Sequence, residues 1–216
     1  NHSNKSWVTS QYDQMVMCDT VQKSGSDAAI IRIHNKDKAI AISVDSSANY
    51  CKSYPFAGGK QIVCENWRNL ISVGAKPLAI TNCLNFGNPE NQEIMGEFVE
   101  CLEGVKMACN FLNYPVVSGN VSFYNGTNKK NIYPTPVIGG VGLIKKLSYP
   151  ISHYFKRANS TIILIGKTFG HIEQSCFLKE NYSITEGKPP EVNLLNEKNN
   201  GESLSMLIDK NLILSA

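Results

Sequence analysis

Two long stretches of the sequence carry hydrophobic residues at helical spacing. In the first, residues at i, i+4, i+7, i+8 and i+11 form one apolar helical face, made by Val63, Trp67, Leu70, Ile71 and Gly74. The second stretch covers residues 92–112 and repeats the pattern with Ile94, Phe98, Leu102, Val105, Cys109 and Leu112. Both patterns predict helices that bury one side in a core.

Short apolar runs, separated by polar or turn-forming segments, predict the strands. Residues 30–33 and 39–44 have the composition of a strand–turn–strand unit. Further strands are predicted at 78–84, 115–124 and 137–144. The order of strands, helix, strand, helix and two strands indicates an α+β or mixed α/β layer.

The composition changes near residue 150, which predicts a main unit followed by a shorter one. We expect residues 1–10 to be a frayed terminus, 11–150 to form a first domain and 151–216 to begin a second. Within the second, the sequence predicts a strand at 161–165, a linker at 187–190 and an amphipathic helix at 203–214. These elements bury too little surface for a full core, so we expect the second domain to be incomplete.

Composition and charge narrow the function classes. Charged residues make up 18% of the chain and the net charge is +3 without a basic block, so neither disorder nor nucleic-acid binding is indicated. The seven cysteines contain no C-x-x-C pair, which argues against structural zinc and fits a reducing compartment. The N-terminus is polar, and no apolar run approaches the length of a membrane span. The sequence therefore predicts a cytoplasmic protein without membrane contact.

A glycine pair stands at the start of the first helical stretch. We expect Gly58 and Gly59 to form a loop that leads through Lys60 into the helix. Such a loop lets backbone N–H groups approach an anion, and the helix N-terminus and Lys60 add positive charge. Two glycines and a lysine are a weaker pattern than a full P-loop, so the pattern alone favours the plainer interpretation of a turn before an amphipathic helix.

Four polar side chains suit a hard cation such as Mg²⁺. Asp45 ends a predicted strand, Glu65 and Asn69 lie one helical turn apart, and Asn120 follows another strand. Carboxylate and amide oxygens are the donors that Mg²⁺ accepts, so these side chains could converge on one ion. For Asp45, the alternative of capping the loop that follows it has equal weight.

The segment from Gly119 to Ser122 offers contacts to a nucleotide or a substrate. Gly119 would let the backbone approach a nucleotide, and Ser122 offers a hydroxyl. An ordinary strand-end turn explains the same residues equally well, because Gly-Asn suits such turns.

No catalytic residue is predicted in this chain. There is no nucleophile elbow, the four histidines have no evident carboxylate or cysteine partner, and neither Cys18 nor Cys83 has a local base.

Ten segments, in order along the chain, resemble the second half of the large synthetase subunit in the phosphoribosylformylglycinamidine synthase family. The most specific are Leu84-Asn-Phe-Gly-Asn-Pro-Glu90 and Gly119-Asn-Val-Ser122. The others are Gln11-Tyr-Asp13, Asp19-Thr-Val21, Gly25-Ser-Asp-Ala-Ala29, Gly58-Gly-Lys60, Trp67-Arg-Asn69, Gly74-Ala-Lys-Pro-Leu78, Tyr133-Pro-Thr-Pro136 and Gly187-Lys-Pro-Pro190.

The resemblance implies an aminoimidazole-ribonucleotide-synthetase-like fold. Its N-terminal α/β domain, with a mixed sheet, pairs with a homologous domain in a barrel-like arrangement, and only the start of its C-terminal α/β domain is present. The implied reaction is the ATP-dependent amidation of phosphoribosyl-formylglycinamide with glutamine-derived ammonia, through a phosphorylated formamide. Implied partners are Mg²⁺, a glutaminase subunit and a small accessory subunit. We also expect the isolated chain to be inactive and to self-associate, because its apolar surface lacks the homologous partner.

Residue by residue, the resemblance assigns roles to ten positions. Position 82, here Asn82, and Gly119 correspond to nucleotide contacts, and Ser122 to a substrate contact. The loop that holds the substrate phosphate corresponds to Gly58, Gly59 and Lys60. Magnesium ligands correspond to Asn120 and, in an auxiliary nucleotide site, to Asp45, Glu65 and Asn69.

The sequence departs from the family pattern at several of these places. Asn82 replaces an aspartate, which removes a charge from the nucleotide contact. The family's arginine, aspartate and glutamate before the glycine pair are replaced at Asn49, Tyr54 and Ala57. These losses favour a second hypothesis, a non-catalytic half that only keeps the domain interface. A third, a stand-alone thiamine-phosphate or selenophosphate kinase-type enzyme, conflicts with the segment 84–90. The sequence leaves open whether this chain is a natural half or a truncation.

Overall fold

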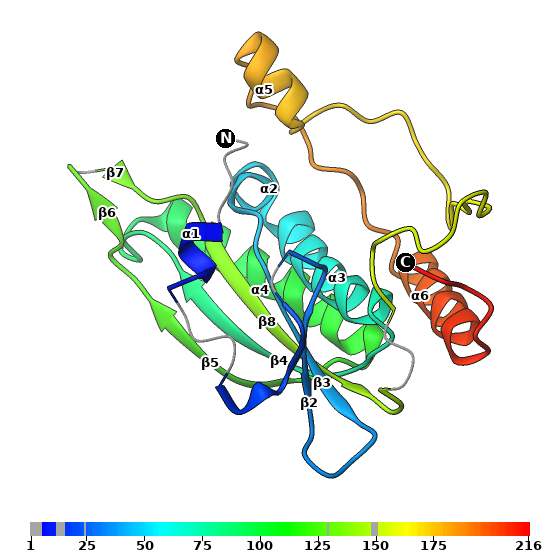
Figure 1. Ribbon diagram of the computed structural model, residues 1–216. Coiled ribbons are helices and arrows are strands. Elements are labelled where there is room, and N and C mark those ends of the chain that lie inside the picture. The colour runs from blue at the N-terminus through cyan, green and yellow to red at the C-terminus, as the bar shows by residue number, and fades with distance from the viewer. Residues whose placement is uncertain (1–5, 12–15, 24, 129, 148–150) are drawn as a thin grey trace.

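A six-stranded mixed sheet forms the centre of the protein, as the computed structural model shows (Figure 1). The structure describes residues 6–11, 16–23, 25–128, 130–147 and 151–216. The strand order is β1-β2-β3-β8-β4-β5, and all neighbours are antiparallel except the parallel pair β4 and β5. The strands are β1 (Thr20–Gln22), β2 (Ala29–Arg32), β3 (Ala39–Asp45), β4 (Lys76–Asn85), β5 (Val116–Ser122) and β8 (Thr135–Ile144). This arrangement confirms the predicted mixed α/β fold class.

Two long helices, α3 (Pro55–Ser72) and α4 (Gln92–Leu112), pack against each other, and α3 lies on β3 and β8. Short helix α2 (Ala48–Ser53) precedes α3, and α6 (Leu194–Asp209) packs on the outer side of α3. The remaining elements are α1 (Ser6–Thr9), the 3₁₀ turn Val16–Cys18, the small hairpin β6 (Gly126–Thr127) and β7 (Lys130–Asn131), and α5 (Cys176–Tyr182). None of the described helices is both long and apolar enough to cross a membrane.

The boundaries of α4 follow from local sequence signals. Asn91 caps its start, with a side-chain oxygen that accepts a hydrogen bond from the Glu93 N–H. Asn113 ends it in the left-handed conformation (φ 52°), which asparagine tolerates better than most residues. The predicted range 92–112 is therefore confirmed, as are the strand–turn–strand unit of β2 and β3 and the stop at Gly74, where φ is +81°.

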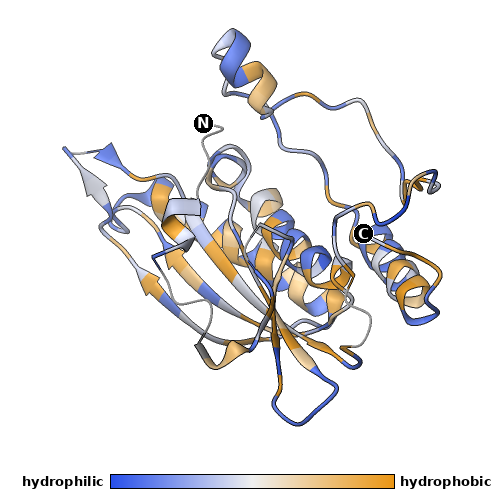
Figure 2. Cartoon of the chain, viewed as in Figure 1, coloured by the Kyte–Doolittle hydropathy of each residue, from blue (hydrophilic) through white to orange (hydrophobic). Residues whose placement is uncertain are grey.

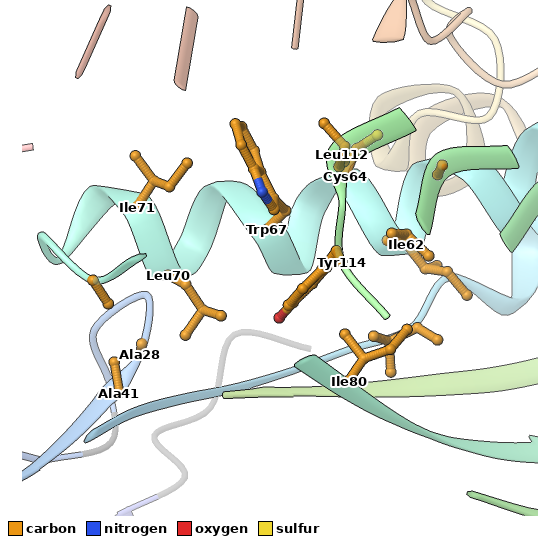
Figure 3. Packing of buried hydrophobic residues seen from close by; sticks show 14 of the residues in the cluster. Ala28, Ala41, Ile62, Cys64, Trp67, Leu70, Ile71, Ile80, Leu112 and Tyr114 are labelled. Carbon is orange, nitrogen blue, oxygen red and sulfur yellow. The ribbon is translucent and has the colours of Figure 1, made fainter. Parts of the chain in front are cut away.

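The core lies between the sheet and α3, and Figure 3 shows α3 burying two sides. Leu70 points toward the strands, with Tyr114 and Ile80 on the same side of the helix, whereas Trp67 and Ile71 point away from the sheet. On the outer side, a Cβ at Gly201 of α6 would collide with the Trp67 ring, so α6 packs closely there. The alternating hydropathy of the strands and the hydrophilic turn between β2 and β3 are visible in Figure 2.

The opposite face of the sheet, which we call the open face, carries many exposed side chains on the described strands. β3 alternates strictly, with Ala39, Ala41 and Ser43 buried and the side chains between them exposed. Val44, the most exposed of these, is 66% accessible. Exposed apolar side chains on this face come from three adjacent strands, namely Ile31, Ile40, Ile42, Val44 and Val141.

Two expectations about local structure need correction. Residues 161–165 form no strand, and their apolar side chains are exposed, because no described strand lies beside them to complete a ladder. The last helix covers Leu194–Asp209 instead of 203–214, because Asn193 caps an earlier start. Residues 187–190 contain no helix or strand and connect α5 to α6, as expected of a linker, and the Pro190 carbonyl oxygen accepts a hydrogen bond from Gln61 Nε2 (2.9 Å).

The domain division stays a prediction. Residues 1–5 of the expected frayed terminus, and the expected boundary at residue 150, lie outside the described residues. Residues 6–9 form α1, which has no buried residue.

Candidate functional site

A cluster of polar side chains surrounds Asp45 where β3 ends beneath α3. We call Ser43, Asp45, Glu65, Asn66, Asn69 and Tyr114 the Asp45 cluster. Asp45 Oδ1 accepts a hydrogen bond from Asn69 Nδ2 (2.8 Å), and Oδ2 accepts from Ser43 Oγ and from Asn66 Nδ2 (2.8 Å each). The structure thus brings Asp45 and Asn69 together, as the sequence predicts.

Asn66 and Tyr114 form the fully buried base of the cluster. Asn66 Nδ2 also donates to the Ser43 carbonyl oxygen (3.1 Å), and Tyr114 Oη donates to Asn66 Oδ1 (2.7 Å). Gly140 of β8 lies directly below, and a Cβ there would overlap both Asn66 Oδ1 and Tyr114 Oη. A glycine at this position is therefore required by the close approach of these two side chains.

The electrostatics of the cluster favour a positive ligand. Burial raises the pKa of the Glu65 carboxyl, the nearby Asp45 charge raises it further, and Arg68 acts in the opposite direction. Burial and the Glu65 charge also raise the pKa of the Tyr50 hydroxyl. Two neighbouring carboxylates repel each other, so a divalent cation or a proton between them relieves the repulsion.

The donors of the Asp45 cluster fit part of a magnesium shell. Mg²⁺ is often held by one or two carboxylates, with water and phosphate oxygens completing its shell, and Asp45 and Glu65 supply such a pair. Among the described residues, no group of three or more His, Cys, Asp or Glu side chains could hold a metal by itself. Any cation here would therefore need amide, water or ligand oxygens as well.

A second polar region lies at the carboxyl ends of the parallel strands β4 and β5. The register pairs Asn82 with Gly119, Cys83 with Asn120, and Asn85 with Ser122. Asn82 lies over Gly119 so closely that a Cβ on Gly119 would overlap the Asn82 side chain. The two predicted nucleotide contacts are therefore neighbours on one face of the sheet.

Asn120 and Ser122 lie on the other face of β5, because side chains alternate along a strand. Ser118 Oγ, which shares their face, donates to Thr81 Oγ1 (2.8 Å). Ser122 Oγ accepts a hydrogen bond from Asn125 Nδ2 (3.1 Å). Asp45 points to the helix-covered face instead, so the structure does not join Asn120 to the Asp45 cluster.

The expected loop at the glycine pair is wrong. Gly58 and Gly59 lie inside α3 and are buried, and the Gly58 N–H donates to the Tyr54 carbonyl oxygen (2.8 Å). Cβ atoms at these positions would collide with Cys51 of α2 and with the Cys101 carbonyl oxygen of α4, respectively. These glycines allow three helices to approach closely. Lys60 Nζ lies 5.0 Å from the centre of the Phe56 ring.

Asn66 and Tyr114 are the residues that the sequence interpretation missed. Asn66 stands on the apolar stripe of α3, three residues after Val63 and beside Trp67. A polar residue at a core position is a recognisable signal, because buried amides need hydrogen-bond partners. Tyr114, two residues after the end of α4, carries no comparable local signal.

The fold is that of AIR synthase related proteins. Residues 25–144 match the family model for AIR synthase related protein, N-terminal domain, and the chain belongs to this family. It is similar over its whole length, at 58% identity, to the phosphoribosylformylglycinamidine synthase subunit PurL of Pelagibacter ubique (strain HTCC1062), of which it covers 30%.

Two solved structures are also similar. T. maritima PurL complexed with FGAR matches 96% of this chain and 30% of that chain, with 28% identity and a TM-score of 0.69. T. maritima PurL complexed with ATP matches 70% of this chain and 25% of that chain, with 35% identity and a TM-score of 0.62. The chain therefore spans less than a third of the length of these relatives.

Proposed function

We propose that this chain is part of a phosphoribosylformylglycinamidine synthase, a carbon–nitrogen ligase of purine biosynthesis. The reaction would convert phosphoribosyl-formylglycinamide to the amidine with ATP and glutamine-derived ammonia. The observation that carries the proposal is the pair of parallel strand ends, where Asn82, Gly119, Asn120 and Ser122 gather on neighbouring strands. The similarity to PurL complexed with FGAR and with ATP supports the same assignment.

In this proposal, ATP supplies the phosphoryl group that activates the formamide oxygen, and ammonia then displaces phosphate from the carbon. Asn82 and Gly119 contact the nucleotide, and Ser122 contacts the substrate. Asn82 can donate or accept hydrogen bonds but carries no charge, so positioning dominates its role. The proposal assigns no catalytic acid, base or nucleophile to the described residues.

The helical glycine pair implies a different mode of substrate binding from the expected phosphate-binding loop. It involves Gly58, Gly59 and Lys60. The two glycines bring α2 and α4 close to the start of α3. In this proposal the Lys60 ammonium, which lies over the Phe56 ring in the structure, would contact the substrate phosphate. The first free backbone N–H groups of α3 belong to Phe56 and Ala57, because the Gly58 N–H is already bonded within the chain.

Mg²⁺ would be held in two places. Asn120 offers an amide oxygen on the exposed edge strand, and Asp45, Glu65 and Asn69 offer the carboxylate pair and an amide at the auxiliary site. In the structure Asn69 directs Nδ2 toward Asp45, so its amide must rotate to present Oδ1 to a cation.

The same proposal includes partners. A glutaminase subunit would supply ammonia, and a small accessory subunit would join the complex in the cytoplasm. The exposed apolar face of β2, β3 and β8 supports pairing with a homologous domain or, in the isolated chain, with a second copy. Because this chain covers 30% of a PurL subunit, we propose that it is inactive alone.

A non-catalytic interface half is the second candidate. Tyr54 replaces a family aspartate. Lys188 Nζ lies 5.1 Å from the centre of the Tyr54 ring, so a side chain of the same chain already contacts this position. Together with the uncharged Asn82, this contact favours a half whose ligand loops have changed.

Calorimetry of the 216-residue chain with Mg-ATP, and separately with phosphoribosyl-formylglycinamide, tests the two candidates. The ligase proposal expects binding that Asn120→Ala or Ser122→Ala weakens. The matched control is Val99→Ala, which truncates an exposed valine on α4 instead of on β4 or β5. Binding of neither ligand would favour the interface half, and amidation by the chain alone would contradict its proposed inactivity.

A further inference from the structure

The orientation of the buried Asn66 amide is fixed by its surroundings. Its Nδ2 faces three acceptors, the carbonyl oxygens of Ser43 and Ile138 and the Asp45 carboxylate, none of which can donate a hydrogen bond. Asn66 Oδ1 must therefore face Tyr114, whose hydroxyl donates its proton at 2.7 Å. A flipped amide would direct its oxygen at a carboxylate.

This arrangement restrains Asp45 more strongly on one oxygen than on the other. Oδ2 accepts two hydrogen bonds, from Ser43 Oγ and Asn66 Nδ2, which occupy its two lone pairs. Oδ1 accepts one bond, from Asn69 Nδ2, and keeps a lone pair. Oδ1 is thus the oxygen of Asp45 that remains able to bind a cation.

We propose that Asn66 is a positioning residue for a divalent cation at the Asp45 cluster, with Tyr114 fixing the direction of the Asn66 amide. The inference rests on the proposed metal role of Asp45 and Glu65. Asn66 touches neither cation nor substrate. It holds the Asp45 carboxylate in place from below, as partners of ligating side chains do in other metal sites.

Close packing holds Asn66 and Tyr114 rigidly in place. Asn66 and Tyr114 are fully buried, and Gly140 brings the backbone of β8 directly against both. The hydrogen bonds join α3, the end of β3 and Tyr114 beyond α4, so a movement of Asp45 would disturb contacts in three parts of the fold.

The test is a titration of the 216-residue chain with Mn²⁺ alone, in which electron paramagnetic resonance measures the free ion. Asp45→Asn identifies the site, because it removes the ligand charge. Asn66→Ala should weaken Mn²⁺ binding about 10- to 100-fold, the loss typical of such supporting partners. Tyr114→Phe, which removes only a hydroxyl, should cause a smaller loss in the same direction.

Two control variants separate positioning from general destabilisation. Ile94→Ala truncates a buried side chain of the second core cluster, remote from Asp45, and should leave Mn²⁺ affinity unchanged while lowering the melting temperature. Tyr133→Phe removes an exposed tyrosine hydroxyl and should change neither.

Two results would overturn the inference in distinguishable ways. If Asp45→Asn abolishes binding but Asn66→Ala and Tyr114→Phe bind Mn²⁺ as Ile94→Ala does, Asn66 has no positioning role and the proposed metal site stands. If the unmodified chain binds no Mn²⁺, or Asp45→Asn binds it equally well, both the positioning role and the auxiliary metal site fail, while the strand-end site of the proposed ligase remains to be judged by its own ligands.

Discussion

The close crossing of α3 and α4 depends on two glycines, one on each helix. Gly59 of α3 faces α4, and Gly104 of α4 faces α3. A Cβ at Gly104 would lie 3.0 Å from the Phe56 carbonyl carbon, 3.1 Å from the Lys60 nitrogen, and closer still to the Phe56 oxygen. A Cβ at Gly59 would meet the Cys101 carbonyl oxygen and the Val105 nitrogen (3.2 Å) of α4. Because all these atoms belong to backbone, a side-chain rotation cannot relieve the overlap.

Gly104→Ala should therefore destabilise the protein. Restoring ordinary contact distances of about 3.5 Å requires the helices to move apart, and overpacking of this kind costs about 3 kcal/mol. Alanine returns about 1 kcal/mol through its higher helix propensity. The net loss is about 2 kcal/mol, which corresponds to a fall in melting temperature of about 4 to 8 °C for a chain of this size.

Gly96→Ala is the matched control on the same helix. Its Cβ would meet no atom within 4 Å, so only the propensity gain remains and stability should rise by about 1 kcal/mol. Thermal and urea unfolding, followed by circular dichroism, measure both variants. The reasoning is refuted if Gly104→Ala proves as stable as Gly96→Ala. The double variant Gly59→Ala/Gly104→Ala should lose less than the sum of the single losses, because one separation of the helices accommodates both methyl groups.

Two further predictions concern acid stability and association. A hydrogen bond from Arg32 lowers the pKa of the Asp19 carboxyl below its usual 3.8; desolvation opposes this shift and a hydrogen bond with His34 adds to it. The ionised Asp19 therefore stabilises the folded state above pH 3.8. This stabilisation should be lost as the pH falls through the lower pKa of the folded state. Asp19→Asn should flatten that part of the acid-unfolding curve, and an unchanged curve would contradict the assignment. On the open face, Ile42→Lys should reduce self-association in sedimentation velocity, whereas Val99→Lys on α4 should not; a strictly monomeric parent chain at high concentration would refute the expected self-association.

The sequence by itself determined the elements with strong local patterns. The apolar stripe, the asparagine caps and the left-handed Asn113 specify α4, and strict alternation specifies the two faces of β3. Gly74 ends α3 because it adopts a positive φ with little strain. The convergence of Asp45 and Asn69 was predictable too, because one ends a strand and the other lies on the helix that covers it.

Only the tertiary structure decided the role of the glycine pair. Gly58 and Gly59 are compatible with a loop or a helix when the local sequence is considered alone. Close contacts with α2 and α4 favour the helix, because a side chain at either position would prevent the approach. The segment 161–165 shows the reverse case, since a strand-like sequence needs a neighbouring strand for its backbone hydrogen bonds.

The division of the site also required the fold. Because side chains alternate along β5, Gly119 and Asn120 lie on opposite faces of the sheet. The sheet register pairs Gly119 with Asn82. Tyr114 becomes a partner of Asn66 only because α4 returns it beneath α3, 48 residues later in the chain. Local patterns therefore determined which residue types could bind ligands, whereas long-range packing determined which of them lie together.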